Sequence, residues 1–407
     1  MNKLNHCPHF WLPWLLILLF CAPLDAKAAP PSQDLRKLIG DSDGVIIADP
    51  RGKIVFEKNS TPKRIPASTL KIVTALAALH YLGPTYRFNT DFFLDAQKNL
   101  RVKGYGDPLL ISEVWADIAA ALARKTDRVS DIILDDSHFS HPIAIPGIHS
   151  SFQPYDAPNG ALCANFNTVF FKRTPSGGYV SAESQTPLLP FVIQRIKASA
   201  LGSERIILSN NNREATLYAG HLLKYFLNQN GLATGGLVRI KKAPARADEL
   251  ILRYTSPFDL QAVIARLLEY SNNFIANQIL IATGAALYNP PGTLSKGIHA
   301  LLSYLETELG ITGIALVEGS GISKKNRISA AHMLTVLNKF EPYHHLMRNE
   351  GPEFYKTGNL WGVSTRAGYL RHTGGGLYRF VVFINTPHKS TNAVMRKIRA
   401  LVSSLPD

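Results

Sequence analysis

The sequence predicts an α/β fold in which an α+β module is inserted into a main domain. Strand-like runs occur near residue 45 and again between about residues 353 and 387, and helical patterns lie before and between them. From about residue 88 to 250, short strands alternate with helices. A chain of 407 residues exceeds one ordinary core, so two domains are expected. We assign residues 29–87 and 251–407 to the main domain and residues 88–250 to the insertion.

The first 28 residues have the form of a secretory signal peptide. Lys3 precedes an apolar run from Phe10 to Phe20, and Ala26-Lys27-Ala28 has the small-x-small pattern of a cleavage site. The alternative, an uncleaved anchor, fits poorly because the run is too short to span a bilayer. We therefore predict that residues 1–28 are removed on export to the periplasm or the extracellular face of the envelope.

The charge, the cysteine count and the histidine spacing limit which classes of partner and cofactor are expected. The net charge of +14 is spread along the chain without a basic stripe interleaved with aromatic residues, which argues against nucleic acid and predicts peripheral contact with anionic envelope surfaces. Cys7 and Cys21 leave with the signal, so Cys163 alone remains and no internal disulfide is expected. Since no His/Cys cluster has ligand spacing, neither a metal nor a cofactor is expected.

The predicted elements follow from turn residues and periodicity. A helix is expected at residues 32–40, a hairpin around Pro50-Arg51-Gly52, and a helix from Ser68 that stops at Gly83-Pro84. A helix at 256–270 has an apolar face at helical spacing, and a second helix begins at Phe274. The other expected strands lie within 91–108, 131–139, 168–183, 204–212, 353–358, 365–376 and 378–387, and the other expected helices at 112–125, 214–231 and 391–405.

Ser68 and Lys71 are the strongest candidates for chemistry. Residues three apart share one face of a helix, and this helix is apolar on nearly all sides. A buried lysine tends to lose its proton, and a neutral lysine can accept a proton from a neighbouring hydroxyl. Ser68 also lies at the helix start, where free backbone N–H groups favour developing negative charge.

This spacing alone leaves other interpretations open. Ser68 can be a helix cap, and Lys71 can extend its ammonium group to solvent. Ser60-Thr61-Pro62-Lys63 has the same spacing, but it contains a proline and no apolar helix follows it.

Two later motifs strengthen the case. Serine nucleophiles with a lysine base are typically accompanied by Ser-x-Asn and Lys-Thr-Gly. Ser-x-Asn occurs at Ser209, Ser271 and Ser390, and only Ser271–Asn273 lies in the main domain in the right order, between two amphipathic helices. Lys356-Thr357-Gly358 occurs once, at the end of a predicted strand.

With these motifs in order, the sequence resembles the class C low-molecular-mass penicillin-binding proteins, which are D-alanyl-D-alanine carboxypeptidases and endopeptidases. The resemblance implies a β-lactamase/DD-transpeptidase-like domain with an antiparallel sheet flanked by helices. The long interval between Ser68 and Ser271 fits this family's inserted module. The stretches that carry the resemblance are "PASTLKIVTALAAL", "KGYGDPLL", "ILDDSHF", "EYSNNFIANQIL", "VEGSGISKKNRIS" and "KTGNLWGVSTRAGYL".

The resemblance also implies roles for individual residues. Ser68 would attack the penultimate D-alanine carbonyl of a peptidoglycan stem peptide, with Lys71 as base. Ser271 would relay a proton to the leaving amine, and Asn273 would hold Lys71 and the substrate. Lys356 and Thr357 would bind the terminal carboxylate, Gly358 would admit the substrate along the strand edge, and the backbone N–H groups of Ser68 and Asn359 would form the oxyanion hole. β-Lactams would acylate Ser68 and act as covalent inhibitors.

Two positions depart from the family pattern. Lys324 replaces an arginine that relatives often carry, and Trp361 replaces a small or polar residue. Both positions help to bind the stem-peptide side chain in relatives. A lysine point charge does not reproduce an arginine fork, so a different side-chain preference is expected.

The prediction is an exported serine DD-peptidase that trims the terminal D-alanine and can also cut cross-links. A β-lactamase is one alternative, although no acidic residue has spacing that marks it as a deacylation base. A non-catalytic cell-wall binding protein on the same fold is the other.

Overall fold

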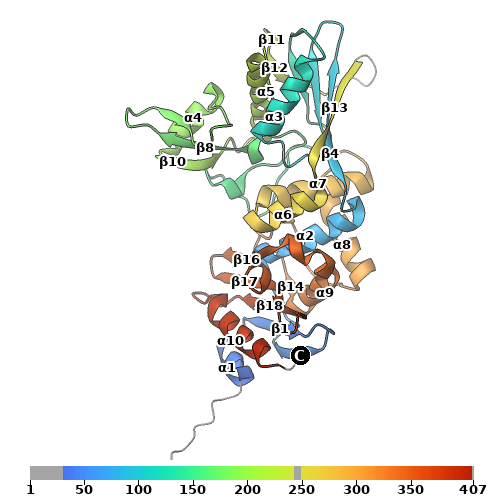
Figure 1. Ribbon diagram of the computed structural model, residues 1–407, viewed down its shortest axis with the longest axis vertical. Coiled ribbons are helices and arrows are strands. Elements are labelled where there is room, and N and C mark those ends of the chain that lie inside the picture. Colours follow the sequence, from blue (N-terminus) through green and yellow to red (C-terminus); the bar gives the residue numbers. More distant parts are fainter. Residues whose placement is uncertain (1–30, 243–248, 406–407) are drawn as a thin grey trace, which may run out of the picture.

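A computed structural model describes residues 31–242 and 249–405 (Figure 1). The predicted signal peptide, residues 1–28, lies outside the described residues. The molecule is elongated, with the first and last elements together at one end and residues of the inserted segment at the other. Within the described ranges no helix is long and apolar enough to cross a membrane.

A six-stranded antiparallel sheet lies at the centre of the predicted main domain. The first strand of the chain pairs with the last, Ile46 opposite Val381, so the two ends of the chain build one sheet. This confirms the expected α/β class with an antiparallel sheet. The order is β15 (Arg348–Glu350), β16 (Glu353–Leu360), β17 (Val363–Arg371), β18 (Leu377–Ile384), β1 (Gly44–Ala48) and β2 (Ile54–Lys58).

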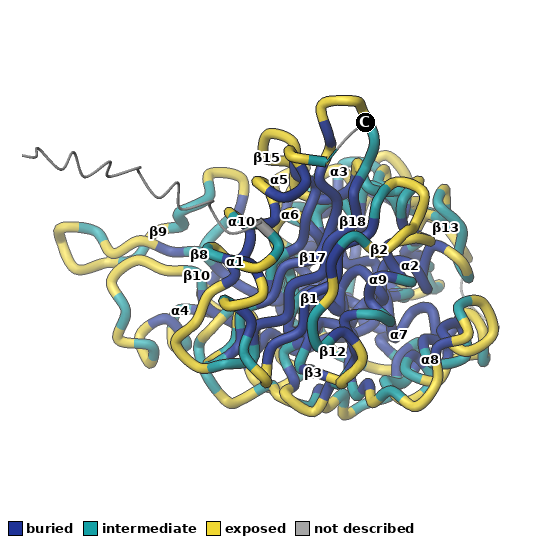
Figure 2. Tube along the Cα trace, turned by 90° about the horizontal axis from the view of Figure 1, so that it is seen from below, coloured by how far each residue is buried: buried dark blue, intermediate teal, exposed yellow. Residues whose placement is uncertain are grey.

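Helices cover both faces of this sheet, and its central strands β17, β18 and β1 are therefore buried on both sides, whereas the edge strands β15 and β2 are more exposed (Figure 2). Val45 and Ile47 face α1 (Pro31–Leu38) and α10 (Thr391–Ser403), whereas Ile46 and Ala48 face the larger core with α2 and α9 (Ala330–Phe340). This alternation follows the two-residue period of a strand.

The helices of the larger core surround α2 (Leu70–Leu82). A 3₁₀ turn, η1 (Ala67–Thr69), precedes α2, and Leu70 to Leu79 are all buried. The sequence predicted the helix after Ser271 to be amphipathic, and this prediction is wrong. It is buried on all sides from Phe274 to Ala285, because its only polar side chains are small or find internal partners. The neighbouring helices are α6 (Leu260–Tyr270), α7 (Asn273–Tyr288) and α8 (Leu294–Leu309).

The predicted insertion, together with the strands that flank it, contains a five-stranded sheet and a smaller three-stranded sheet. The strand that leaves the main domain, β4 (Arg87–Leu94), pairs with the strand that returns, β13 (Glu249–Asp259). The proposed boundaries at 87/88 and 250/251 fall within this pair, and the division remains a prediction.

The remaining elements are as follows. The five-stranded order is β12 (Val238–Ile240), β7 (Ile132–Asp135), β5 (Leu100–Gly104), β4 and β13, and the three-stranded order is β10 (Ser203–Ile207), β8 (Thr168–Arg173) and β9 (Tyr179–Ser181). The helices of the predicted insertion are α3 (Ser112–Ala123), α4 (Pro190–Ser199) and α5 (Asn212–Gln229). Short elements are β3 (Lys63–Arg64) with β14 (Ile328–Ser329), β6 (Arg128–Val129) with β11 (Ala233–Thr234), and the 3₁₀ turns η2 (Pro154–Asp156), η3 (Asn165–Asn167) and η4 (Glu341–Leu346).

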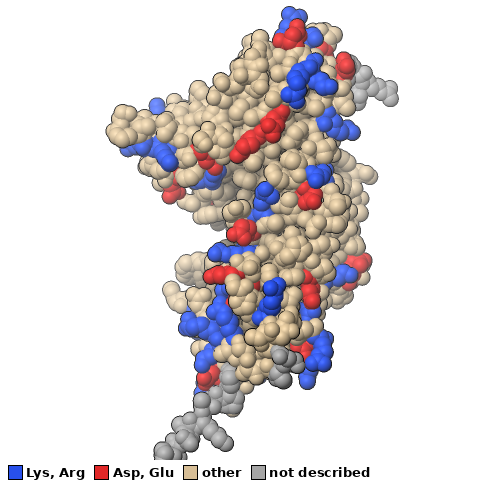
Figure 3. Space-filling model, in the orientation of Figure 1, with Lys and Arg blue, Asp and Glu red and all other residues tan. Residues whose placement is uncertain are grey.

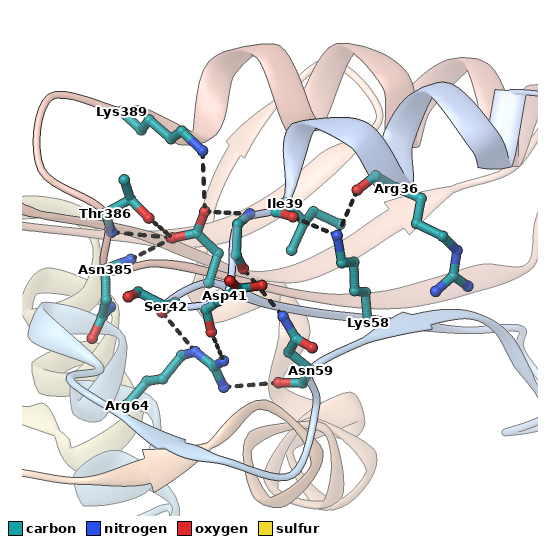
Figure 4. A network of polar contacts seen from close by, with 12 residues as sticks. Arg36, Ile39, Asp41, Ser42, Lys58, Asn59, Arg64, Asn385, Thr386 and Lys389 are labelled. Atoms are coloured by element: carbon teal, nitrogen blue, oxygen red, sulfur yellow. Dashed lines mark hydrogen bonds and ion pairs between the residues drawn. The ribbon is translucent and has the colours of Figure 1, made fainter.

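A polar clasp joins the beginning of the chain to its end (Figure 4). The buried Asp43 carboxylate accepts hydrogen bonds from the backbone N–H groups of Asn385 and Thr386 and from the Thr386 hydroxyl. Arg64 donates to the backbone carbonyls of Asp41, Ser42, Asn59 and Pro62. The clasp therefore fixes the segment that leads directly to Ser68.

Candidate active site

Ser68 and Lys71 lie where the 3₁₀ turn η1 passes into α2, with Lys71 in the first turn of that helix. Ser68 belongs to η1, whose first residue, Ala67, has a left-handed φ of 46°. Lys71 Nζ lies 2.9 Å from Ser68 Oγ. The geometry thus satisfies the first requirement for a nucleophile and its base, a hydrogen-bond distance between them.

The surroundings of Lys71 match those of a neutral amine. Its side chain is fully buried, and Nζ also lies 2.7 Å from Asn273 Oδ1 and 2.7 Å from the Ser320 carbonyl oxygen. A neutral amine has two N–H donors for these two acceptors and one lone pair for the hydroxyl of Ser68. Burial lowers the pKa of Lys71 well below its usual value, the charge of Lys356 lowers this pKa further, and the charge of Glu318 opposes both effects.

The Ser-x-Asn motif occupies the break between α6 and α7. Ser271 ends α6 with a left-handed φ of 54°, and Asn272 caps α7 by accepting a hydrogen bond from the N–H of Ile275. Asn273 then begins α7, and its side-chain oxygen reaches Lys71. A sharp turn directly before the helix therefore places Asn273 against the base, with Ser271 two residues away.

The Lys-Thr-Gly motif lies within β16, which continues to Leu360 beyond the predicted strand end. Within the described residues, β15 pairs only with Glu353, Phe354 and Tyr355, so the outer edge of β16 from Lys356 onward has no strand partner. Such an edge can accept an extended peptide as an additional strand.

Gly358 allows this strand to approach Ser68 closely. A Cβ atom at Gly358 would lie 2.6 Å from the backbone nitrogen of Ser68 and 2.5 Å from Thr365 Oγ1. No side chain fits there without movement of the strand or the turn. The N–H of Ser68 and the edge of β16 are therefore immediate neighbours.

Lys356 is a second buried cation in this region. Its side chain is only slightly exposed, and Nζ donates to the Thr357 carbonyl oxygen at 2.9 Å. Burial lowers the pKa of Lys356 to about 8, Arg348 contributes in the same direction, and Glu269 opposes it. A pH slightly above neutral is therefore enough to remove the proton, and with it the charge, from Lys356.

The two unusual residues contact each other just beyond β16. Lys324 Nζ donates to the Trp361 carbonyl oxygen at 2.9 Å and lies 5.0 Å from the centroid of the Trp361 ring. Trp361 is 79% exposed. Asn359 is also exposed, and its side chain accepts a hydrogen bond from Ser364. Lys324 and Trp361 thus form a single cation–aromatic surface at the end of the open strand edge.

The competing motif matches have structural roles elsewhere. Lys63 lies in β3 and donates to the Gly313 carbonyl, Asn211 caps α5, and Ser390 caps α10. The first Ser-x-x-Lys match is therefore not helical, and the other Ser-x-Asn matches satisfy helix ends.

A buried carboxylate beside the site escaped the sequence reasoning. Glu318 lies on the loop that supplies the Ser320 carbonyl, and Asn277 of α7 contacts the same carboxylate. The available signal was an acidic residue directly before Gly-Ser-Gly, where a carboxylate can accept the N–H groups of a tight turn. In residues 31–242 and 249–405, no three His, Cys, Asp or Glu side chains form a metal-like cluster.

A groove opens beside Ser271 and Asn273, between the α6–α7 break and the inserted segment. Its volume is about 780 Å³. Figure 3 shows the surface hollowed between the arm that carries β8 and β10 and the body below it. The wall of the groove contains aromatic residues and charges of both signs, including Tyr155, Phe166, Glu183, Arg205, Phe258 and Arg266.

A serine paired with a buried lysine, next to an open strand edge, is the arrangement of a serine hydrolase that forms an acyl-enzyme. The family of D-Ala-D-Ala carboxypeptidase 3 (S13) enzymes matches residues 24–208 and 195–349. The chain belongs to this family of serine peptidases.

Known proteins agree with this assignment over most of the chain. D-alanyl-D-alanine carboxypeptidase DacB of Haemophilus influenzae is 23% identical, over 95% of this chain and 94% of its own. D-alanyl-D-alanine carboxypeptidase of Actinomadura sp. (strain R39) is 24% identical, over 84% and 77% respectively.

Solved structures share the fold. Penicillin-binding protein 4 of H. influenzae matches with a TM-score of 0.74 and 22% identity, over 92% of this chain and 99% of that chain. A predatory peptidoglycan endopeptidase of Bdellovibrio bacteriovorus matches with a TM-score of 0.55 and 17% identity, over 88% and 90% respectively. The H. influenzae protein has also been solved in complex with a β-lactam.

Proposed function

We propose that this protein is a serine DD-peptidase that hydrolyses the terminal D-Ala-D-Ala bond of peptidoglycan stem peptides through an acyl-serine at Ser68. The observation that carries the proposal is the 2.9 Å distance between Ser68 Oγ and the buried Nζ of Lys71. Lys71 takes the hydroxyl proton as Oγ attacks the penultimate D-alanine carbonyl. The N–H groups of Ser68 and Asn359 stabilise the resulting oxyanion.

The remaining steps use the other motif residues. Ser271 passes a proton to the amine of the departing D-alanine while Asn273 keeps Lys71 in place. Lys356 and Thr357 bind the terminal carboxylate before it leaves. Water then attacks the ester at Ser68 and releases the shortened peptide. A β-lactam acylates Ser68 in the same way as the peptide. Its leaving amine remains part of the bound molecule when the ring opens, so the adduct persists.

The experiment that tests this function is the intact mass of the protein after incubation with benzylpenicillin, alongside the Ser68→Ala variant. We expect a stable adduct on the wild type and none on the variant, together with D-alanine release from a pentapeptide. Drug consumed without an adduct would indicate a β-lactamase. No adduct with the drug intact, and no D-alanine released, would indicate a non-catalytic wall-binding protein.

Cleavage of cross-links is a second proposed activity, favoured by the groove beside Ser271. A cross-linked substrate carries a second peptide beyond the scissile bond, and this needs space next to the proton relay. The groove begins at that position and has room for several amino-acid residues. Its aromatic walls and paired charges suit a substrate with both apolar and polar groups.

We also propose that the protein acts outside the cytoplasmic membrane, after removal of residues 1–28. The support is the signal-like sequence and a substrate class located in the cell wall. The net charge of the full chain, +14, stays strongly positive without residues 1–28 and favours approach to anionic wall polymers.

A further inference from the structure

Glu318 is an unusual carboxylate because it is fully buried without a basic hydrogen-bond partner among the described residues. Burial of an isolated carboxylate costs free energy, so other groups must compensate for the lost hydration of Glu318. Six hydrogen bonds reach it, all from neutral donors. They come from the N–H groups of Ser320, Gly321 and Ser323, the Ser320 hydroxyl, and the side-chain amides of Asn277 and Asn326.

These bonds shape the loop that contacts the base. The N–H of Ser320 donates to Glu318 at 2.7 Å, and the carbonyl of the same residue accepts from Lys71 Nζ at 2.7 Å. Thr74 on α2 holds the neighbouring Gly319 carbonyl at 2.7 Å. The carboxylate therefore fixes the orientation of one of the two acceptors that position Lys71.

Glu318 is also connected to the second acceptor. Asn277 lies one turn after Asn273 on α7, on the same face of the helix. Its amide nitrogen donates to Glu318, and its amide oxygen accepts the N–H of Gly319 at 2.8 Å. The carboxylate thus joins the Ser320 loop to the helix that carries Asn273.

The charge of Glu318 matters because the other ionisable groups here are cations. The charges of Lys356 on β16 and of Glu318 both act on Lys71 of α2, whereas α7 contributes only the neutral Asn273 and Asn277. Arg348 and Glu269 act on Lys356 from further away. When Ser68 loses its proton to Lys71, a second buried cation forms beside Lys356, and a nearby anion favours that state.

We propose that Glu318 is a positioning residue for Lys71, which orients the Ser320 carbonyl and supplies the negative charge that stabilises the ammonium formed during acylation. This inference rests on the proposed acyl-serine function. Glu318 itself does not touch the reacting atoms.

The test compares Glu318→Gln, which removes the charge, with Glu318→Asp, which keeps it. The acylation rate with benzylpenicillin is measured by intact mass across pH 5 to 10, after circular dichroism and thermal unfolding have confirmed the fold. In the profile of acylation rate against pH, the acid limb reports protonation of Lys71. For Glu318→Gln we expect the maximal acylation rate to fall about tenfold or more, because Lys71 is a weaker base without the neighbouring charge. The acid limb should move about half a pH unit or more to lower pH. For Glu318→Asp the acid limb stays at the wild-type position.

A third variant, Asn326→Ala, separates loop order from charge, because it removes one neutral donor to Glu318 and the acceptor of the Val317 N–H while it keeps the carboxylate. We expect a lower rate with an unmoved acid limb, and this variant tests the positioning role even if Glu318→Gln does not fold. An unmoved limb in Glu318→Gln, or an equal shift in Asn326→Ala, would overturn the electrostatic role. An unchanged rate in Asn326→Ala would overturn the positioning role. Absence of acylation in the wild type would instead refute the proposed function.

Discussion

At the residue scale, the proposed reactivity of the site depends on Lys71. Its burial and the charge of Lys356 lower its pKa, so a side chain that is normally protonated can act as a base. The sequence predicted this pair from spacing and an apolar helix. It did not identify the Ser320 carbonyl or Glu318. The acidic residue before Gly-Ser-Gly indicated a tight turn, but nothing local indicated that this distant loop contacts Lys71.

Lys71→Ala should abolish acylation while leaving the fold intact, because it removes the base together with a costly buried amine. A positioned base typically contributes a factor of about 10² to 10⁴, so the rate of adduct formation should fall by at least about a hundredfold. The matched control is Lys63→Ala, in the other Ser-x-x-Lys match, which should acylate like the wild type. Retention of the wild-type rate by Lys71→Ala would exclude Lys71 as the base.

The pH dependence of D-alanine release should be bell-shaped. The acid limb reports loss of the neutral amine of Lys71, whose pKa lies below its usual value. The pKa of Lys356 is lowered to about 8, so its charge is present below that pH and is lost as the pH rises through it. We therefore expect kcat/KM for a pentapeptide to decline above about pH 8.

Arg348→Ala provides the check on that basic limb. Removing the Arg348 charge raises the pKa of Lys356, so the basic limb should move to higher pH. A basic limb that stays fixed in this variant would mean that a group other than Lys356 controls it.

Gly358→Ala should slow acylation about tenfold or more without unfolding the protein, because the new methyl group displaces either β16 or the Ser68 turn. Adduct formation and the free energy of unfolding are measured together. Gly202→Ala is the control, since a Cβ atom there meets nothing within 4 Å. Equal rates in the two variants would contradict the close approach of Gly358 to Ser68.

At the element scale, the break between α6 and α7 determines where Asn273 lies. The sequence predicted this break, the hairpin at β1 and β2, the terminal helix α10 and the strands that carry the last third of the sheet. It missed β13, because residues 249–259 span the expected boundary at 250/251 and contain Pro257, and pairing with β4 overrides that local pattern. It misjudged α7, although the residues of this helix are apolar on nearly all sides, which is the pattern of a buried helix.

Removing the cap of α7 should couple stability to activity. Asn272→Ala loses the hydrogen bond to the N–H of Ile275 and should lower the free energy of unfolding by about 1 kcal/mol. Because Asn273 lies in the same turn, acylation should also slow. Asn211→Ala removes the corresponding cap of α5 and should cost similar stability at no cost in acylation. Urea denaturation and adduct kinetics distinguish the two outcomes.

At the scale of the whole molecule, the groove lies between regions that are far apart in the sequence, so local patterns could not predict it. Gln185 lines the groove and is exposed. Gln185→Trp should obstruct it and reduce cleavage of a cross-linked muropeptide dimer several-fold, while D-alanine release from a monomeric pentapeptide is unchanged. The control is Gln97→Trp, at an exposed glutamine in the loop between β4 and β5. Equal loss on both substrates would argue against a role for the groove in cross-link cleavage.

The pairing of β1 with β18 and the clasp at Asp43 have a consequence for biosynthesis. The strand made first has no neighbour on one side until the strand made last has emerged, so closure of the sheet requires contacts of very high sequence separation. A nascent chain that already contains Ser68, Lys71 and Asn273 still lacks β16 and the backbone N–H groups of Asn385 and Thr386 that bind Asp43. The residues around Ser68 therefore come together only after β16 to β18 have been made. A translation product truncated before β16 is expected to have no peptidase activity.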